Sequence, residues 1–374
     1  MILPGATLGM LGGGQLGRMF TVAARTLGYR VMVLDPDPDS PAGRIADEHI
    51  HAAYSDTWAL EQLGKSCAVV TTEFENISAD VLRQLSEYCP VRPSASAVEI
   101  AQNRIREKTF IRDNGLATAE FATISSEDDI EAACETVNFP AILKRAELGY
   151  DGKGQVVVED IALVASAFSG LGKLPCVLEE KIDLEKEISV ILGRNVQGES
   201  QCFPIAENVH RQGILHSTTV PASVSQRFEE QAETAAIRLA DALDFCGVMA
   251  VEFFISTSGD LLVNEIAPRT HNSGHYTLDA CVTCQFEQQV RMVCGLPFGD
   301  TRLLSPVTMI NLLGDVWQEG SPPWSVLLSD PAVKLHLYGK QQARPGRKMG
   351  HFNYLGEDRS HAEKLFSELS HGNG

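Results

Sequence analysis

The sequence has no apolar run long enough to span a bilayer, and its first ten residues lack the basic stretch and apolar core of a secretory signal. Positive charge is also scarce, since 31 Lys and Arg stand against 49 Asp and Glu, a net charge of −18. A protein that binds nucleic acid needs a basic face. We therefore expect a cytoplasmic protein that acts on small molecules, with no nucleic-acid partner and no membrane partner.

The nine cysteines form neither a zinc pattern nor a disulfide framework. Only Cys281 and Cys284 have CxxC spacing, and no second such pair or spaced histidine pair accompanies them. They lie in a run that looks helical. Reduced thiols that pack in the core are therefore expected.

Strand and helix patterns alternate near the N-terminus. Short apolar runs cover residues 7–11, 29–34 and 67–71, and a stretch with helical spacing covers 19–27. This alternation predicts a parallel, doubly wound sheet up to about residue 100.

The remainder follows an α+β pattern. The expected helices cover 97–114 and 226–243, and the expected strands cover 139–145, 156–158, 175–180, 188–192, 248–255, 261–265, 307–312 and 333–338. A length of 374 residues fits two or three domains. We predict an N-terminal Rossmann-like domain over 1–100, a second domain over 101–300 with a lid over about 118–190, and a small β-rich domain over 301–374.

A first glycine motif, Gly12-x-Gly14-x-x-Gly17, follows the first strand and opens a helix, and Asp35 closes the next strand. This arrangement is typical of dinucleotide binding, with the acid on the ribose. The same geometry serves any phosphate-bearing ligand, because glycine allows close approach and a helix N-terminus attracts anions. The motif alone leaves the ligand open.

A second glycine motif, GYDGKGQ at 149–155, follows Lys144 at the end of a strand. It is not a Walker A sequence, but a mobile glycine-rich hairpin can close over a polyphosphate with backbone N–H groups and a lysine charge. Further along, Glu179, Glu180 and Glu187 lie at strand ends. They fit either an adenine-ribose pocket or a solvated strand end.

Two carboxylates give the clearest chemical indication. Glu252 lies within the apolar run MAVEFFI, and Glu265 ends the run LLVNEI after a short turn. The two runs should form neighbouring antiparallel strands, so both carboxylates can face one site. Glutamate is seldom buried unless it is paired or bound to metal, and Mg²⁺ prefers oxygen ligands. The pair therefore predicts a magnesium site.

Together these motifs resemble the ATP-grasp superfamily and, within it, the PurK family of 5-(carboxyamino)imidazole ribonucleotide synthases. The resemblance covers nearly the whole chain and includes GGGQLGRM at 12–19, TTEFENI at 71–77, GYDGKGQ, EEKI at 179–182, ENVHRQGILH at 207–216, FCGVMAVEFF at 245–254, VNEIAPRTHNSGHYT at 263–277 and RPGRKMGH at 344–351. It implies an ATP-grasp fold of mixed α/β and α+β character, with a Rossmann-like N-terminal domain and a small β-rich C-terminal domain. It also implies a cytoplasmic homodimer.

The resemblance implies a carbon–nitrogen ligase of de novo purine (IMP) biosynthesis. Such an enzyme converts ATP, bicarbonate and 5-aminoimidazole ribonucleotide into ADP, phosphate and the N-carboxylated product through carboxyphosphate. The first glycine loop would then serve the ribonucleotide. By this resemblance ATP is held by Arg104, Lys144, Gly149, Tyr150, Asp151, Gly152, Lys153, Gly154, Gln155, Glu179, Glu180, Lys181, Ile182, Glu187, His210, Asn264 and Glu265. Magnesium is held by Glu252 and Glu265.

The substrates are surrounded, on the same ground, by Gln15, Leu16, Glu73, Asn76, Tyr150, Asp151, Arg269, His271, Asn272, Ser273, Lys340 and Arg347. The residues expected to take part in the chemistry are Arg269, His271, Lys340 and Lys153. His271 fits either a catalytic role or a role in holding its loop.

Three alternatives compete with this interpretation. One is an NAD(P)-dependent oxidoreductase, which depends on the first glycine motif and Asp35. Another is a different ATP-grasp ligase, such as the formate-dependent glycinamide ribonucleotide transformylase or a biotin carboxylase. The third is a non-catalytic nucleotide-binding module, which fits poorly with the paired Glu252 and Glu265.

Overall fold

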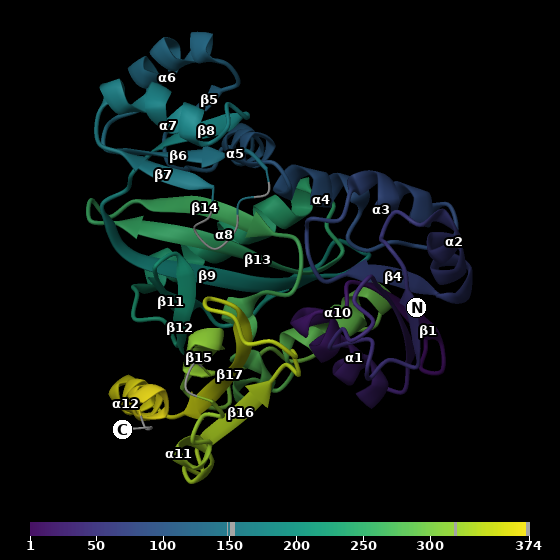
Figure 1. Cartoon of the computed structure of the whole chain (residues 1–374). Helices are drawn as coiled ribbons and strands as arrows, with labels where there is room; N and C mark the ends of the chain where they lie inside the picture. The colour runs from purple at the N-terminus through teal and green to yellow at the C-terminus, as the bar shows by residue number, and fades with distance from the viewer. Residues whose placement is uncertain (148, 150–153, 318–319, 372–374) are drawn as a thin grey trace.

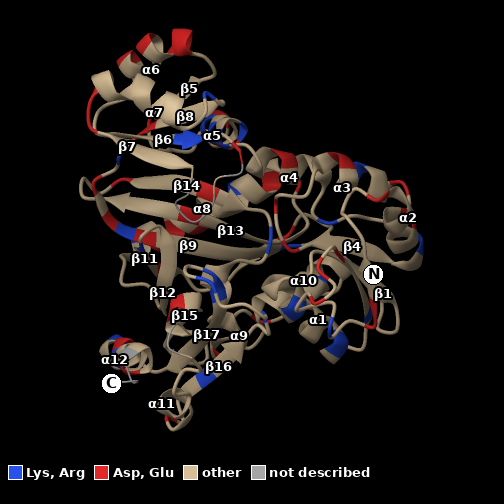
Figure 2. Cartoon of the chain, in the orientation of Figure 1, with Lys and Arg blue, Asp and Glu red and all other residues tan. Residues whose placement is uncertain are grey.

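A computed structural model describes residues 1–147, 149, 154–317 and 320–371. Three sheets organise these residues (Figure 1). Lys and Arg are scattered over the whole fold and do not gather on one element (Figure 2). Within the described residues, no helix combines the length and the apolar character that a membrane crossing requires.

The first sheet is parallel and four-stranded, in the order β3-β2-β1-β4. Its strands are β1 (Thr7–Leu11), β2 (Arg30–Asp35), β3 (Glu48–His51) and β4 (Val69–Thr72), and its helices are α1 (Gln15–Thr26), α2 (Thr57–Ser66) and α3 (Ala79–Ser86). Parallel strands end at one edge of a sheet, so the loops after β1, β2 and β4 meet there. This edge holds the first glycine motif, and the predicted doubly wound sheet is confirmed.

The second sheet has nine strands, in the order β14-β13-β9-β11-β12-β15-β17-β16, with β10 beside β9. Its strands are β9 (Leu184–Arg194), β10 (Ser200–Cys202), β11 (Ala206–Arg211), β12 (Ile214–Val220), β13 (Gly247–Ser256), β14 (Leu261–Ala267), β15 (Val307–Leu313), β16 (Val333–Leu337) and β17 (Lys348–Leu355). Neighbouring strands in it are antiparallel. The pairing of β12 with β15 carries the sheet across residue 300, while the predicted domain bounds stay a prediction.

The third sheet is small and antiparallel, in the order β5-β8-β6-β7, and lies above β14 in Figure 1. Its strands are β5 (Phe121–Ile124), β6 (Ala141–Arg145), β7 (Gln155–Val158) and β8 (Cys176–Glu180). The other helices are α4 (Ala95–Ala101), α5 (Arg104–Asp113), α6 (Ile130–Thr136), α7 (Val164–Gly170), α8 (Gln226–Ala242), α9 (Thr277–Ala280), α10 (Gln285–Cys294), α11 (Ser325–Leu328) and α12 (Arg359–His371).

Helices α8 and α10 cover the second sheet, which is the central one, and α10 also joins it to the first sheet. The small residues Ala232, Ala236 and Ala240 of α8 let this helix lie close on the apolar residues of β9 and β13. Phe286 and Val290 of α10 share a core with the residues of β1 and α1. The edge with the first glycine motif is therefore held firmly beside the central sheet.

Two local predictions are wrong. The single helix expected over 97–114 is two helices, because the Asn103 side chain accepts hydrogen bonds from the backbone N–H groups of Ile105 and Arg106 and begins a new helix there. Cys281 and Cys284 lie between α9 and α10 and not inside a helix. The Cys284 sulfur accepts from the Glu287 backbone N–H and caps α10.

Candidate active site

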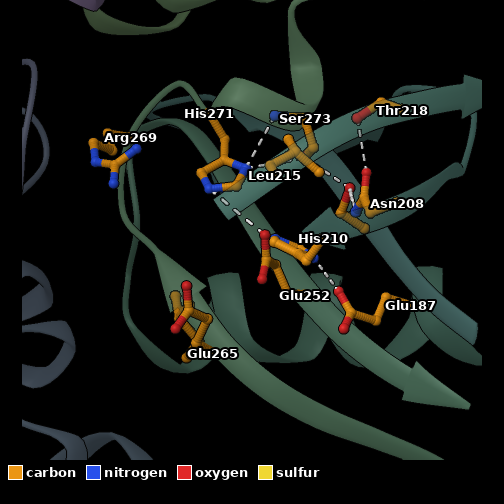
Figure 3. A network of polar contacts seen from close by, with 12 residues as sticks. Glu187, Asn208, His210, Leu215, Thr218, Glu252, Glu265, Arg269, His271 and Ser273 are labelled. Carbon is orange, nitrogen blue, oxygen red and sulfur yellow. Dashed lines mark hydrogen bonds and ion pairs between the residues drawn. The ribbon is translucent and has the colours of Figure 1, made fainter. Parts of the chain in front are cut away.

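The two predicted carboxylates lie side by side. Glu252 of β13 and Glu265 of β14 are partners in the antiparallel register, so their side chains lie on one face of the sheet (Figure 3). Glu252 is 8% exposed. Burial, and then the charge of Glu265, raise the pKa of Glu252 to about 7. This face therefore concentrates negative charge, which His210 and Lys348 of the same sheet offset only in part.

A cavity of about 510 Å³ opens above this face, between the central sheet and the small sheet. Many of the predicted site residues line it, although they come from distant parts of the chain. They are Asn76, Arg104, Lys144, Gly149, Gln155, Glu179, Glu180, Lys181, Ile182, Glu187, His210, Glu252, Asn264, Glu265, Arg269, His271 and Asn272.

A buried cluster of charge lies under the small sheet. Lys144 Nζ is 2.8 Å and Lys108 Nζ is 3.3 Å from Glu179 Oε2, and the Glu179 side chain is 3% exposed. Burial on its own raises the pKa of Glu179, but the two lysines outweigh it and bring the pKa down to about 2. Both lysines bind Glu179 Oε2, whereas Oε1 is buried and has no hydrogen-bond partner among the described residues. Sequence reasoning did not assign Lys108 to the site.

Arg104 connects α5 to the carboxylate pair. Its Nη1 lies 3.5 Å from Glu265 Oε2. One turn later, Glu107 Oε1 accepts a hydrogen bond of 2.6 Å from the backbone N–H of Ile266 and so fixes the strand that carries Glu265. Burial, and then Glu265, raise the pKa of Glu107 to about 8. Glu107 lines the cavity and was also missed, because nothing in the helix pattern marks it.

His210 and Glu187 form an ion pair across β11 and β9, with His210 Nδ1 next to Glu187 Oε2 (Figure 3). Burial alone would lower the pKa of His210, but the hydrogen bond and charge of Glu187 raise it. A bulge in β11 at Val209 and His210 turns the histidine toward the cavity.

The loop after β14 carries Arg269 and His271. The Arg269 guanidinium binds both carboxylate oxygens of Glu75, with an Nη2–Oε1 distance of 3.2 Å. His271 Nε2 lies 3.7 Å from Glu252 Oε1. Gln285 holds the backbone of His271 through two hydrogen bonds, from His271 N to Gln285 Oε1 and from Gln285 Nε2 to His271 O. Glu75 was missed because its partner Arg269 is 194 residues away, and Gln285 because no sequence pattern links it to His271.

The first glycine loop has its own carboxylates. Glu73 accepts from the backbone N–H groups of Gly14 at 2.6 Å and of Gly17 at 2.7 Å. Asp35 Oδ2 accepts from Gly13 N at 2.6 Å and from the Tyr54 hydroxyl at 2.7 Å. The donors that would hold a pyrophosphate, and the acid that would hold a ribose, are therefore already paired. This arrangement argues against the NAD(P) alternative.

The other described residues of the prediction do not line this cavity. Lys340 Nζ donates to Gln15 Oε1 and, over 2.7 Å, to the backbone oxygen of Lys348, which lines the cavity. Arg347 Nη1 donates to the backbone oxygen of Gln342 at 2.9 Å. Leu16 packs against the core of the first sheet, Gly154 precedes β7, and Ser273 is buried behind His271. Tyr150, Asp151, Gly152 and Lys153 lie outside the described residues.

Comparisons with known proteins cover almost the whole chain. A ribonucleotide synthetase preATP-grasp domain matches residues 5–102, an ATP-grasp domain matches 109–286, and a phosphoribosylaminoimidazole carboxylase C-terminal domain matches 307–365. N5-carboxyaminoimidazole ribonucleotide synthase of Bacillus subtilis is 43% identical over 95% of this chain and 93% of its own length.

Solved structures agree. A crystal structure of N5-carboxyaminoimidazole ribonucleotide synthetase in complex with ADP superposes with a TM-score of 0.92 at 42% identity, over 99% of this chain and 97% of the other. The Aspergillus clavatus synthase in complex with ADP and 5-aminoimidazole ribonucleotide gives 0.88 at 31% identity, over 97% of both chains. The chain belongs to the N5-carboxyaminoimidazole ribonucleotide synthase family of ATP-grasp proteins.

Proposed function

We propose that this protein is an ATP-dependent carbon–nitrogen ligase that carboxylates 5-aminoimidazole ribonucleotide with bicarbonate. The products are 5-(carboxyamino)imidazole ribonucleotide, ADP and phosphate, and the step belongs to de novo purine synthesis. The observation that carries the proposal is the carboxylate pair Glu252 and Glu265 below a cavity that Arg104 and Lys144 also line. The similarity of almost the whole chain to members of the family supports it.

ATP occupies the cavity between the small sheet and the central sheet in this proposal. Cationic Arg104 and Lys144 face its phosphates, and the backbone of 179–182 faces the base. Glu187, held by His210, is placed to accept hydrogen bonds from the ribose hydroxyls. The predicted roles of Asn264 and of residues 149–155 in nucleotide binding belong to the same proposal.

Glu252 and Glu265 fit a magnesium ion. They offer hard oxygen donors on one face, and burial, followed by the charge of Glu265, raises the pKa of Glu252. Among the described residues, no group of three or more His, Cys, Asp or Glu side chains gathers into a metal site, so substrate oxygens would complete the coordination. Bound there, the ion would neutralise phosphate charge.

The chain's own residues position the reactants. Bicarbonate oxygen attacks the γ-phosphorus, the bond to ADP breaks, and carboxyphosphate forms. Arg269, held by both oxygens of Glu75, faces the charge that develops. The exocyclic amine then attacks the carbonyl carbon of carboxyphosphate and displaces phosphate, or attacks CO₂ that carboxyphosphate has released together with phosphate. In either case the amine nitrogen loses one proton. Lys340, His271 and Lys153 are the further groups assigned to this chemistry.

The ribonucleotide lies toward the first sheet in this proposal. Its surroundings would be Gln15, Leu16, Glu73, Asn76, Asn272, Ser273, Lys340 and Arg347, together with Tyr150 and Asp151. In this proposal Arg347 and Lys340 bind the 5′-phosphate, since both are cations and arginine pairs with phosphate through two parallel hydrogen bonds. We also propose a homodimer in the cytoplasm, from the family resemblance.

An ADP-release assay tests the proposal. We expect turnover with 5-aminoimidazole ribonucleotide that rises on addition of bicarbonate and requires Mg²⁺. Glycinamide ribonucleotide with formate serves as the comparison, because a formate-dependent transformylase would use that pair. Turnover with formate and none with bicarbonate would overturn the assignment.

A further inference from the structure

A chain of hydrogen bonds leads from His271 into the sheet behind the cavity (Figure 3). Ser273 Oγ lies 2.9 Å from His271 Nδ1, and Ser189 Oγ donates to Ser273 Oγ over 2.8 Å. Asn208 Nδ2 donates to Ser189 Oγ over 3.0 Å, and Thr218 Oγ1 donates to Asn208 Oδ1 over 2.9 Å. All four side chains behind the ring are buried, so water does not compete for these bonds.

The hydrogen bonds in this series donate in one fixed direction. The backbone N–H of Ser273 points at His271 Nδ1 over 3.3 Å, so this nitrogen accepts and carries no proton. The Ser273 hydroxyl must then also donate to Nδ1, which leaves its oxygen to accept from Ser189. The amide N–H of Asn208 supplies the donor that Ser189 needs. The direction set at the ring and the direction set at the amide agree.

A ring with an unprotonated Nδ1 carries its hydrogen on Nε2. His271 Nε2 faces the cavity, 3.7 Å from Glu252 Oε1. We infer that Asn208 and Ser189 are positioning residues, which hold His271 as the Nε2–H tautomer so that the ring donates a hydrogen bond to an oxygen of the bicarbonate-derived group. This inference rests on the proposed function.

The series of hydrogen bonds orients the ring and does not carry protons. An amide nitrogen has no free lone pair, so Asn208 cannot accept a proton on one side and release one on the other. Among the described residues, the series of hydrogen bonds also ends at the buried Thr218. Gln285 adds to the orientation, because its two hydrogen bonds hold the backbone of His271 in place.

Replacing Asn208 with aspartate should reverse the direction, at the cost of the long and therefore weak 3.3 Å bond from the Ser273 backbone N–H. An ionised carboxylate only accepts, so Ser189 would donate to it and then accept from Ser273. Ser273 would in turn accept from a protonated His271 Nδ1. Long-range proton–nitrogen NMR of the substrate-free protein, isotopically labelled in histidine, reads the tautomer directly. The His271 signal is identified by its loss in His271→Gln.

We expect Nε2–H in the native protein and Nδ1–H in Asn208→Asp, with kcat lower by about 10²-fold and KM for ATP unchanged. Thr219→Val is the matched control, because Thr219 lies next to Thr218 and its hydroxyl has no hydrogen-bond partner among the described residues. It should keep the native tautomer and kcat. Nδ1–H in the native protein, or a native tautomer in Asn208→Asp, would overturn the inference.

Ser189→Ala provides a second, uncharged variant if aspartate at position 208 prevents folding. It removes the donor to Ser273, so we expect both tautomers in the NMR spectrum and a smaller loss of kcat. One native tautomer together with native kcat would again contradict the inference. The NMR readout needs no substrate, so its failure is distinguishable from failure of the proposed reaction in the ADP-release assay.

Discussion

Two buried glutamates in different parts of the molecule show opposite arrangements. Glu73 at the edge of the parallel sheet and Glu252 on the antiparallel sheet are 9% and 8% exposed. Glu73 accepts hydrogen bonds from two glycine N–H groups, whereas the carboxylate of Glu252 accepts none from the residues that the structure describes. A buried carboxylate with its donors in place stabilises its own loop, even where that loop borders a substrate, and one without them keeps its lone pairs for a ligand.

Neutralising Glu252 should have the largest effect, and this effect should be a loss of activity. We expect Glu252→Gln to lower kcat for ADP release by about 10²- to 10³-fold, because the variant keeps one carboxylate where the site needs two. The free energy of unfolding without ligand should not fall, since repulsion between Glu252 and Glu265 is relieved. Steady-state assays and urea unfolding measure both, with exposed Glu185→Gln as control. Native turnover in Glu252→Gln would remove the basis of the comparison.

Glu179 extends the comparison to a carboxylate that two lysines neutralise. Glu179→Gln leaves Lys108 and Lys144 buried without their partner, so we expect the free energy of unfolding at neutral pH to fall by about 3 kcal/mol. The folded pKa of about 2 lies below the ordinary value of about 4.3. The contribution is therefore complete above the unfolded pKa and is lost as pH falls toward the folded one.

Urea unfolding across acid pH checks this prediction. The native protein should lose stability between about pH 4.3 and pH 2 more steeply than Glu179→Gln. Glu180→Gln, at the neighbouring and partly exposed position, is the control and should follow the native curve. Identical curves for all three proteins would show that the lysines do not stabilise the Glu179 carboxylate.

Neutralising Glu73 should act on stability. A glutamine side chain has one accepting oxygen, so Glu73→Gln leaves either Gly14 N–H or Gly17 N–H facing an amide NH₂. We expect the free energy of unfolding to fall by about 2 kcal/mol. Urea unfolding measures it, with Glu87→Gln on an exposed helix end as control. Unchanged stability would mean that the loop does not depend on this carboxylate.

The smallest effect is expected from NADH, which should not change the stability of the protein. Because Gly13, Gly14 and Gly17 already donate to protein carboxylates, NADH should leave the melting temperature unchanged. ATP with Mg²⁺ should raise the melting temperature in the same experiment. A rise with NADH would show that the loop releases its carboxylates for a dinucleotide.

Local pattern sufficed for part of this structure. The Glu252–Glu265 pairing was predictable because two apolar runs are joined by a turn too short for anything but a hairpin. The sequence pattern placed one helix over 97–114, although Asn103, a preferred N-cap residue, could have marked the break.

Contacts between distant segments could not be predicted from local sequence patterns. Glu75 and Arg269 are 194 residues apart, and neither side chain indicates the other in sequence. The same holds for Glu107 with Ile266 and for Asn208 with Ser189, which depend on packing and strand register. The roles of the predicted site residues remain proposals.

The continuation of the central sheet past residue 300 has a practical consequence for shortening the chain. Residues Val307–Leu313 cover the backbone of Ser217–Val220 by strand pairing. A truncated protein that ends before residue 304 would present this strand as an open edge, with its N–H and C=O groups ready to pair with another molecule. Such a fragment should aggregate even though the carboxylate pair and most of the cavity lie outside the deleted segment.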